Sequence, residues 1–229
     1  MKVNKSLMIN FFIRKKIKEF AKKVAFKYLK IGKPNYPYNI EPIQISKVIT
    51  ELERLKEIKG NFLEIGVARG LSTRFFCEHI VSQNLEDSLI YYTIDTFKSF
   101  EESHLNFEVE KRGKDKFLIE GFAYNDFETW KKNFSYFEFI KPIESDCTKL
   151  DYKKLSPIKL VFLDVDLYLP TKKTLELLYE ELIDGGCIIV DDVKNNTAVD
   201  GAYQAYLEFC EERNIKKQFI GNKCGLIYK

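Results

Sequence analysis

Four carboxylate side chains follow two short apolar segments in the second half of the chain, and they are the residues best suited to chemistry. Asp164 and Asp166 come directly after one segment, and Asp191 and Asp192 come directly after the other. If the two segments are neighbouring strands, about 4.8 Å apart, these carboxylates converge in one crevice. Crowded carboxylates repel one another unless a cation neutralises them, and oxygen ligands suit a hard divalent ion. The pattern predicts a site for Mg²⁺ or Mn²⁺, with helix capping by Asp166 and Asp192 as the alternative.

A glycine turn follows the first apolar segment and opens a helix. Its pattern is Glu64-x-Gly66-x-x-x-Gly70-x-Ser72, and such a turn lets backbone N–H groups approach a polar ligand. The alternative is a turn in which glycine serves the backbone conformation alone. The pattern G-x-G-x-x-G is missing, and the acid Glu64 would repel a pyrophosphate. S-adenosylmethionine, which carries a sulfonium and an ammonium group and no phosphate, suits this turn better.

Asp95 ends the next apolar segment, where a carboxylate accepts the hydrogen bonds of a ribose diol in nucleotide-binding folds. Ligands of open α/β sheets bind beyond the carboxyl ends of the strands. We therefore expect the glycine turn, Asp95 and the four carboxylates to share one crevice.

The elements that must position these residues are short β-rich segments, which alternate with helical ones from residue 61 onward. This alternation predicts a doubly wound α/β fold with a mostly parallel sheet. The last two segments are only five residues apart, too close for a parallel crossover, so a C-terminal antiparallel hairpin is expected. Helices are expected at 13–28, 45–58, 71–81, 127–134 and 170–183, and seven strands at 62–67, 89–94, 137–140, 160–163, 187–190, 218–220 and 226–228.

The same pattern predicts the domain organisation. Residues 1–59 form a helical arm and cap, and residues 60–229 form the α/β domain. Residues 97–136 are rich in charged and aromatic side chains without a clear period, so they are expected to be an insertion near the site. Specificity for a ligand would then lie in this insertion and in the arm.

The composition is that of an ordinary globular protein, with 45% hydrophobic and 31% charged residues. The 37 Lys and Arg and 34 Asp and Glu give a net charge of +3, too balanced for a nucleic-acid-binding surface. Five widely spaced Cys without a C-x-x-C pair exclude a disulfide framework and a thiolate zinc site, and favour the cytoplasm. No segment has the features of a signal peptide or a membrane span.

The first 32 residues are strongly basic, with ten Lys and Arg and one acid, Glu19. Their apolar residues recur every three or four positions, which places them on one face of a helix. A basic amphipathic helix can lie on an anionic membrane, at about 1 kcal/mol per Lys or Arg near the surface. That interpretation places a cytoplasmic protein at the inner face of a membrane. The alternative is a helix that packs over the mouth of the site or against a neighbouring subunit of a homo-oligomer.

At the site residues the sequence resembles the macrocin O-methyltransferase family, whose members use S-adenosylmethionine to methylate sugar hydroxyls in antibiotic and glycan pathways. The resemblance extends from residue 61 to about residue 215. It depends on the glycine turn, Ile94-Asp95-Thr96-Phe97, Asp164-Val-Asp166-Leu-Tyr168-Leu-Pro-Thr171, Leu175-Glu-Leu-Leu-Tyr179, Gly185-Gly186, Asp191-Asp192 and Asp200-Gly201-Ala202.

The resemblance implies a class I methyltransferase fold and a set of residues that contact the cofactor. Asp95 would bind the ribose, and Asp146, after the third strand, would bind the adenine edge. The residues implied to contact the methionine part are Glu64, Gly66, Gly70 and Ser72.

The resemblance also implies that Asp164, Asp191 and Asp192 hold Mg²⁺, as in the related catechol O-methyltransferases. The ion would bind two oxygens of a diol-like acceptor and lower the pKa of the reacting hydroxyl. It would also orient that hydroxyl in line with the sulfonium methyl group.

The sequence does not identify the general base. The catechol enzymes carry a Lys three residues after the first metal-binding Asp, where this chain has Leu167. His79, in the helix after the glycine turn, is expected to be structural, whereas His104 in the insertion and Asp166 are candidate bases. Asp164 and Asp166 are the predicted catalytic residues.

These observations favour an O-methyltransferase that uses S-adenosylmethionine and Mg²⁺ to methylate a sugar or glycan hydroxyl. The alternatives are a metal-independent methyltransferase for small molecules, and a non-catalytic binding module that keeps the cofactor fold.

Overall fold

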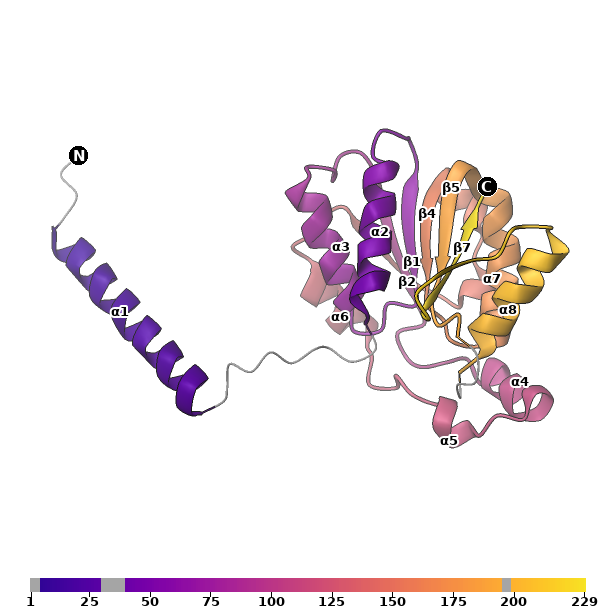
Figure 1. The fold of residues 1–229 in the computed structure, drawn as a ribbon, viewed down its shortest axis with the longest axis horizontal. Coiled ribbons are helices and arrows are strands. Elements are labelled where there is room, and N and C mark those ends of the chain that lie inside the picture. Colours follow the sequence, from indigo (N-terminus) through magenta and orange to yellow (C-terminus); the bar gives the residue numbers. More distant parts are fainter. Residues whose placement is uncertain (1–4, 30–39, 195–198) are drawn as a thin grey trace. The chain divides into compact units, whose positions relative to one another are not determined.

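The computed structural model describes residues 5–29, 40–194 and 199–229, with side chains from residue 14 onward. The chain forms two units, Met1–Asn39 and Ile40–Lys229, and each is described by itself. The first contains α1 (Lys5–Tyr28), the helix predicted from the apolar spacing (Figure 1). From Arg14 onward its side chains are largely exposed, Phe20 to 69%. Within the described ranges, no helix is long and apolar enough to cross a membrane.

The second unit is built around a seven-stranded sheet with the order β3-β2-β1-β4-β5-β7-β6. Strands β1 to β5 pair in parallel, and β7 pairs antiparallel with both β5 and β6 (Figure 1). The predicted doubly wound, mostly parallel fold with a C-terminal hairpin is confirmed. The strands are β1 (Asn61–Ile65), β2 (Tyr91–Asp95), β3 (Ile140–Glu144), β4 (Ile158–Leu163), β5 (Leu182–Val190), β6 (Gln218–Ile220) and β7 (Cys224–Tyr228).

Helices cover both faces of this sheet. Successive strand residues point to opposite faces, so each face presents apolar side chains against which helices pack. Phe62 and Phe162 pack in a cluster with residues of α2, α3 and α6 on one face, whereas Leu63 and Val161 pack with residues of α7 and α8 on the other (Figure 1). The helices of the two layers are α2 (Pro42–Arg54), α3 (Leu71–Ser82), α6 (Phe127–Phe134), α7 (Tyr168–Glu181) and α8 (Gly201–Glu212).

Helix α2 begins three residues before the predicted start. Glu41 and Gln44 form a capping box, and Pro42 occupies the first turn, where its missing N–H costs nothing. Val48 and Leu52 of α2 are buried in the same cluster as the sheet residues. The helix therefore belongs to the core of the second unit, and the domain boundary at residues 59 and 60 stays a prediction.

The third strand lies later in the chain than predicted. The sequence prediction for 137–140 was wrong, because Phe137 and Phe139 lie in a turn, where they pack on the hydrophobic core. The strand itself, Ile140–Glu144, contains Pro142 and is only partly buried. It forms the edge of the sheet, where a proline is tolerated because one side of the strand has no partner.

The insertion contains two short helices before α6, namely α4 (Glu102–Arg112) and α5 (Lys116–Ile119). Glu108 of α4 is buried and accepts a hydrogen bond from the backbone N–H of Tyr168 at 2.6 Å. Arg112 pairs with Glu108 and, at 2.8 Å, with Asp200 before α8. These contacts join the insertion to the first turns of α7 and α8, next to the chain segment that carries Asp166.

Candidate active site

A cavity opens at the carboxyl ends of the parallel strands, as expected for an open α/β sheet. The predicted site residues that line it are Gly66, Asp95, Asp146, Asp164 and Asp166. The insertion supplies the other wall through Phe100, His104 and Phe122. The sequence analysis expected the glycine turn, Asp95 and four carboxylates in one crevice. Asp164 and Asp166 line this cavity, whereas Asp191 and Asp192 are not among its lining residues.

The glycine turn is held against the sheet by Asp95. Its Oδ2 accepts hydrogen bonds from the N–H groups of Val67 and Ala68, at 2.9 and 3.0 Å, and Oδ1 accepts one from Phe97 N–H at 2.7 Å. Gly66 has a φ of 85°, and a Cβ atom added there would lie 1.7 Å from the Asp164 carbonyl oxygen. Only glycine therefore fits between the turn and the end of β4.

Glu64 lies behind the turn and is fully buried. Its carboxylate accepts hydrogen bonds from Ser72 Oγ at 2.5 Å, Thr73 Oγ1 at 2.6 Å and the Tyr91 hydroxyl. Burial raises the pKa of Glu64 to about 7 against the opposing effect of these three donors. Glu64, Gly70 and Ser72 do not line the cavity, so their predicted contact with the methionine part stays a prediction.

Asp146 and His104 lie at another part of the cavity wall. Asp146 caps the short helix Cys147–Lys149, and its Oδ1 accepts hydrogen bonds from Thr148 N–H and Oγ1, both at 2.9 Å. Burial alone would raise the pKa of Asp146, but these bonds and Lys149 outweigh burial and lower it. Burial lowers the pKa of His104, against the nearby charges of Asp146 and Glu101.

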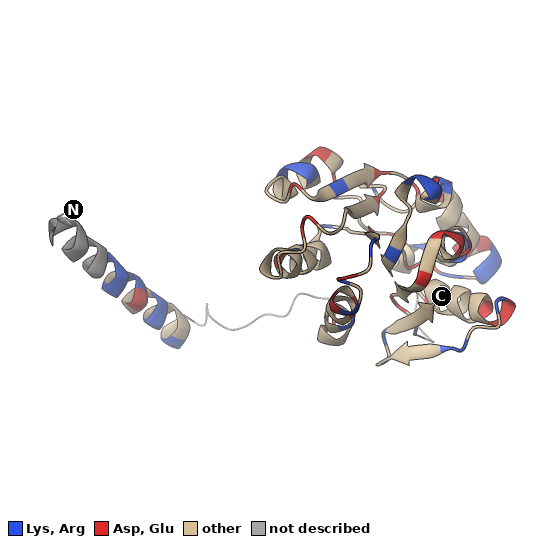
Figure 2. Cartoon of the chain, turned by 90° about the horizontal axis from the view of Figure 1, so that it is seen from above, with Lys and Arg blue, Asp and Glu red and all other residues tan. Residues whose placement is uncertain are grey.

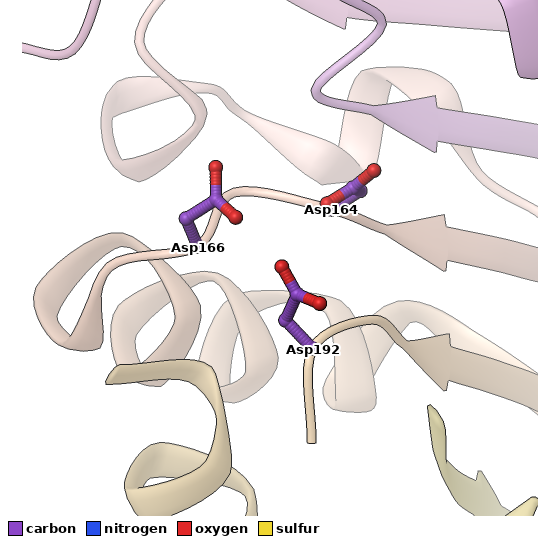
Figure 3. Close-up of side chains that lie close together, drawn as sticks. All are labelled: Asp164, Asp166 and Asp192. Carbon is purple, nitrogen blue, oxygen red and sulfur yellow. The ribbon is translucent and has the colours of Figure 1, made fainter. Parts of the chain in front are cut away.

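Three carboxylates gather at the ends of β4 and β5 (Figure 3). Asp164, Asp166 and Asp192 each offer an oxygen, and the three oxygens lie within 4.8 Å of one another. Asp166 and Asp192 have φ values of 56° and 52°, in the left-handed region that non-glycine residues rarely adopt. Such conformations concentrate at functional sites. We call Asp164, Asp166 and Asp192 the acidic cluster.

The acidic cluster brings like charges together in a buried place. Burial raises the pKa of Asp164 well above its usual value, and repulsion by the neighbouring carboxylates adds to the effect. The pKa of Asp166 is raised for the same reasons and by a hydrogen bond with Asp192. A divalent ion would remove the repulsion, and three carboxylate oxygens are suitable ligands for Mg²⁺ or Mn²⁺.

Asp191 has a different environment from the one expected of a metal ligand. Its Oδ2 lies 2.9 Å from Lys223 Nζ, and its Oδ1 accepts a hydrogen bond from Cys224 Sγ at 3.3 Å. Burial raises the pKa of Asp191 to about 6 although Lys223 opposes it. The same ammonium group bonds to Asp192. The geometry therefore favours Asp166 as the third ligand, and the set predicted from sequence, with Asp191, stays untested.

Asp166 does not cap α7, which was the alternative interpretation. The residue before this helix is Leu167, and no side chain caps the helix there. His79 lies in α3 with its Nε2 2.9 Å from Glu53 Oε1 and does not line the cavity. Sequence reasoning missed Lys223, because only the pairing of the C-terminal hairpin with β5 brings it to the acidic cluster.

The strand order, the glycine turn after β1 and the carboxylate that ends β2 together define the class of S-adenosylmethionine-dependent methyltransferases. The family model of macrocin-O-methyltransferases matches residues 43–224. The chain belongs to this family and is an S-adenosylmethionine-dependent O-methyltransferase. No curated protein matches it in a sequence comparison.

Two solved structures illustrate the shared fold. The O-methyltransferase NovP has a TM-score of 0.66 and 18% sequence identity over 85% of this chain and 84% of its own. The calicheamicin methyltransferase CalS11 has a TM-score of 0.65 and 16% identity over 92% of this chain and 90% of its own. A second structure of CalS11, described as a TDP-rhamnose 3′-O-methyltransferase, has a TM-score of 0.56 and 17% identity over 92% of each chain.

Proposed function

We propose that this enzyme methylates a hydroxyl group of a sugar or glycan acceptor and that a divalent metal activates this hydroxyl. The observation that carries the proposal is the acidic cluster, with three carboxylate oxygens within 4.8 Å at the end of the cavity lined by Gly66 and Asp95. The sugar acceptor is supported by the family and by the TDP-rhamnose 3′-O-methyltransferase activity named for CalS11.

The acidic cluster would hold Mg²⁺ or Mn²⁺, which polarises a bound hydroxyl and lowers its pKa. The side chains of this enzyme supply the remaining requirements. The glycine turn, fixed by Asp95, positions the methyl donor in the cavity. Phe100 and Phe122 meet edge to face at 5.5 Å and form an apolar wall. Such a wall limits the access of water to the reacting groups.

Asp166 can accept the proton that the acceptor hydroxyl loses. Asp166 lines the cavity, and its carboxylate can accept a proton through an oxygen that does not bind the metal. A left-handed backbone at Asp166 and the hydrogen bond from Ala202 N–H to its carbonyl, at 3.0 Å, hold it at the end of the cavity. Asp166 is thus our proposal for the general base, which the sequence alone did not identify.

The test is methyl transfer from radiolabelled S-adenosylmethionine to TDP-rhamnose and a panel of other nucleotide sugars. We expect a methylated sugar with the metal-loaded enzyme, little product after EDTA treatment and recovery on addition of Mg²⁺. Activity that survives EDTA and does not increase with Mg²⁺ would favour the metal-independent alternative. A protein that does not bind S-adenosylmethionine would favour the non-catalytic binding module.

We also infer that the arm holds this enzyme at an anionic membrane surface in the cytoplasm. Phe20 and Tyr28 are exposed to 69% and 67%, and Lys16 and Lys27 of the same helix are also exposed. The positions of Lys and Arg along α1 are blue in Figure 2. The five cysteines are buried and free, which fits a reducing compartment.

Sedimentation with vesicles tests the inference on the arm. The full chain should bind vesicles that contain anionic phosphatidylserine and not neutral vesicles, and binding should weaken with salt. A chain without residues 1–39 is the control. Equal binding by the two chains, or no binding by either, would contradict the membrane role and leave a subunit contact as the alternative.

A further inference from the structure

His104 is the one histidine in the wall of the cavity. It lies in α4 of the insertion and is only 7% exposed. The same cavity is lined by Asp146 and Cys147, which follow β3, and by Pro170 in the first turn of α7. A buried imidazole in a cavity wall presents a polar group to whatever fills the cavity.

The charges around His104 show which part of the cavity it faces. Those that act on it most strongly belong to Asp146, Glu101, Lys173 and Lys149, which come from the segment after β3, the start of α4 and α7. The carboxylates of the acidic cluster are not among them. His104 therefore lies close to Asp146 in the wall of the cavity.

The chemistry of His104 and Asp146 is complementary. A carboxylate can only accept hydrogen bonds, whereas a neutral imidazole offers one N–H donor. The burial that lowers the pKa of His104 keeps the ring neutral near pH 7. Adenine presents the matching groups side by side, since its exocyclic amine is a donor and the neighbouring ring nitrogens are acceptors.

The surrounding wall suits a flat, apolar ring. Ile94 and Phe100 line the same cavity, and aromatic side chains offer large apolar surfaces against which a ring can pack. Asp146 is held in place by its two bonds from Thr148. Its other oxygen, Oδ2, is buried and lies 3.0 Å from Lys149 Nζ, and a carboxylate oxygen can accept a second hydrogen bond.

We propose that His104 recognises the adenine ring of the cofactor by donating a hydrogen bond to the ring nitrogen next to the exocyclic amine, while Asp146 accepts from that amine. This places a cofactor-binding residue in the insertion, outside the motifs of the α/β sheet. The proposal depends on the use of S-adenosylmethionine but not on the metal or the sugar acceptor.

Binding measurements with the full chain and S-adenosylhomocysteine test this role by isothermal titration calorimetry. His104→Leu should weaken binding about tenfold, the usual effect of one lost hydrogen bond. His104→Gln, which keeps an N–H donor, should recover part of the affinity. His79→Leu is the matched control, because His79 does not line the cavity, and it should bind like the wild type.

Two analogues separate recognition from a merely structural effect. S-inosylhomocysteine changes the exocyclic group and the nitrogen on one side of it, and the 7-deaza analogue removes the nitrogen on the other side. The wild type should bind at least one of them more weakly than S-adenosylhomocysteine, and His104→Leu should reduce that preference. The preference against S-inosylhomocysteine that remains would come from Asp146. Wild-type affinity in His104→Leu, or an equal loss for all three ligands, would overturn the proposal. Failure of the metal or sugar assays would leave these results unchanged.

Discussion

The carboxylates at the two halves of the sheet edge have opposite environments. In the half formed by β1, β2 and β3, Asp95 and Asp146 accept hydrogen bonds from backbone N–H groups. In the half formed by β4 and β5, Asp164 and Asp166 face other carboxylates. The pKa of Asp146 is lowered, whereas those of Asp164 and Asp166 are raised.

In the proposed function, the carboxylates in the β1–β3 half of the sheet edge bind the cofactor, and those in the β4–β5 half take part in catalysis. Carboxylates that are already satisfied by N–H donors are fixed acceptors for a neutral or positively charged ligand. Crowded carboxylates repel one another, and a bound metal ion would relieve that repulsion. The number of hydrogen-bond donors around each aspartate therefore distinguishes the proposed binding residues from the proposed catalytic ones.

The largest expected effect is that of changing Asp164, in the half of the sheet edge that is formed by β4 and β5. Asp164→Asn removes a carboxylate that both the sequence and the geometry assign to the metal, so methyl transfer should fall about 10³-fold, equivalent to several kcal/mol. Without metal, the variant should melt higher than the wild type, because one repelling charge is gone. Transfer assays and thermal melts in EDTA measure the two effects. Full activity, or a lower melting temperature in EDTA, would contradict the comparison.

Lys223 provides the next test, because it is the positive charge already present beside the crowded half. Its ammonium group lies 2.9 Å from Asp191 and also contacts Asp192. Lys223→Met should cost about 3 kcal/mol of unfolding free energy in EDTA, since it leaves buried carboxylates without a partner. Mg²⁺ should recover part of the loss. Urea unfolding measures both, with Lys223→Arg as the charge-preserving control. Equal stability of Lys223→Met and the wild type would contradict the role.

A third test distinguishes the two possible ligand sets. Asp166→Asn should weaken Mn²⁺ binding about 100-fold if the acidic cluster holds the ion, whereas Asp191→Asn, which acts through Lys223, should have an effect of about tenfold or less. Electron paramagnetic resonance measures free Mn²⁺ directly. The reverse order of the two effects would restore the set predicted from the sequence, with Asp191 as the ligand.

The last test concerns Glu64, the buried acid behind the glycine turn. Its pKa is raised from 4.5 to about 7, so the folded state keeps a proton that the unfolded chain releases. Stability should therefore fall as the pH rises from about 4.5 to 7, by at most about 1.4 kcal/mol per pH unit. Glu64→Gln lacks this group, so urea unfolding should show a difference from the wild type that changes over this range. A difference that does not vary with pH would contradict the raised pKa.

Much of this arrangement could be predicted from local patterns. The alternation of short apolar segments with helical ones located six of the seven strands, and the five-residue gap before β7 predicted the hairpin. The edge strand β3 was misplaced, because Pro142 and two charged residues are tolerated there while Phe137 and Phe139 pack in a turn. Helix α4 was missed because its buried face includes His104 and Glu108, which weakens the apolar period.

The arrangement of the site depends more on contacts between residues that are distant in the chain, so less of it could be predicted. Asp164 and Asp166 could be located because they directly follow β4. The sequence could not show whether Asp191 or Asp192 faces Asp164. Consecutive residues point in different directions, and the local backbone conformation decides which of the two does so. Lys223 approaches from a hairpin turn, and no local pattern links it to β5.

The C-terminal hairpin closes one side of the sheet, and its turn delivers an ammonium group to the reaction centre. Strand β7 pairs along β5 in a fixed register, with Cys187 opposite Tyr228. Shortening the turn by one residue would shift the pairing of β6 with β7, in which Ile220 lies opposite Cys224, and would move Lys223. The tail of this enzyme is therefore a poor place for truncation, because the last strand sets the charge balance of the chemistry as well as protecting the sheet border.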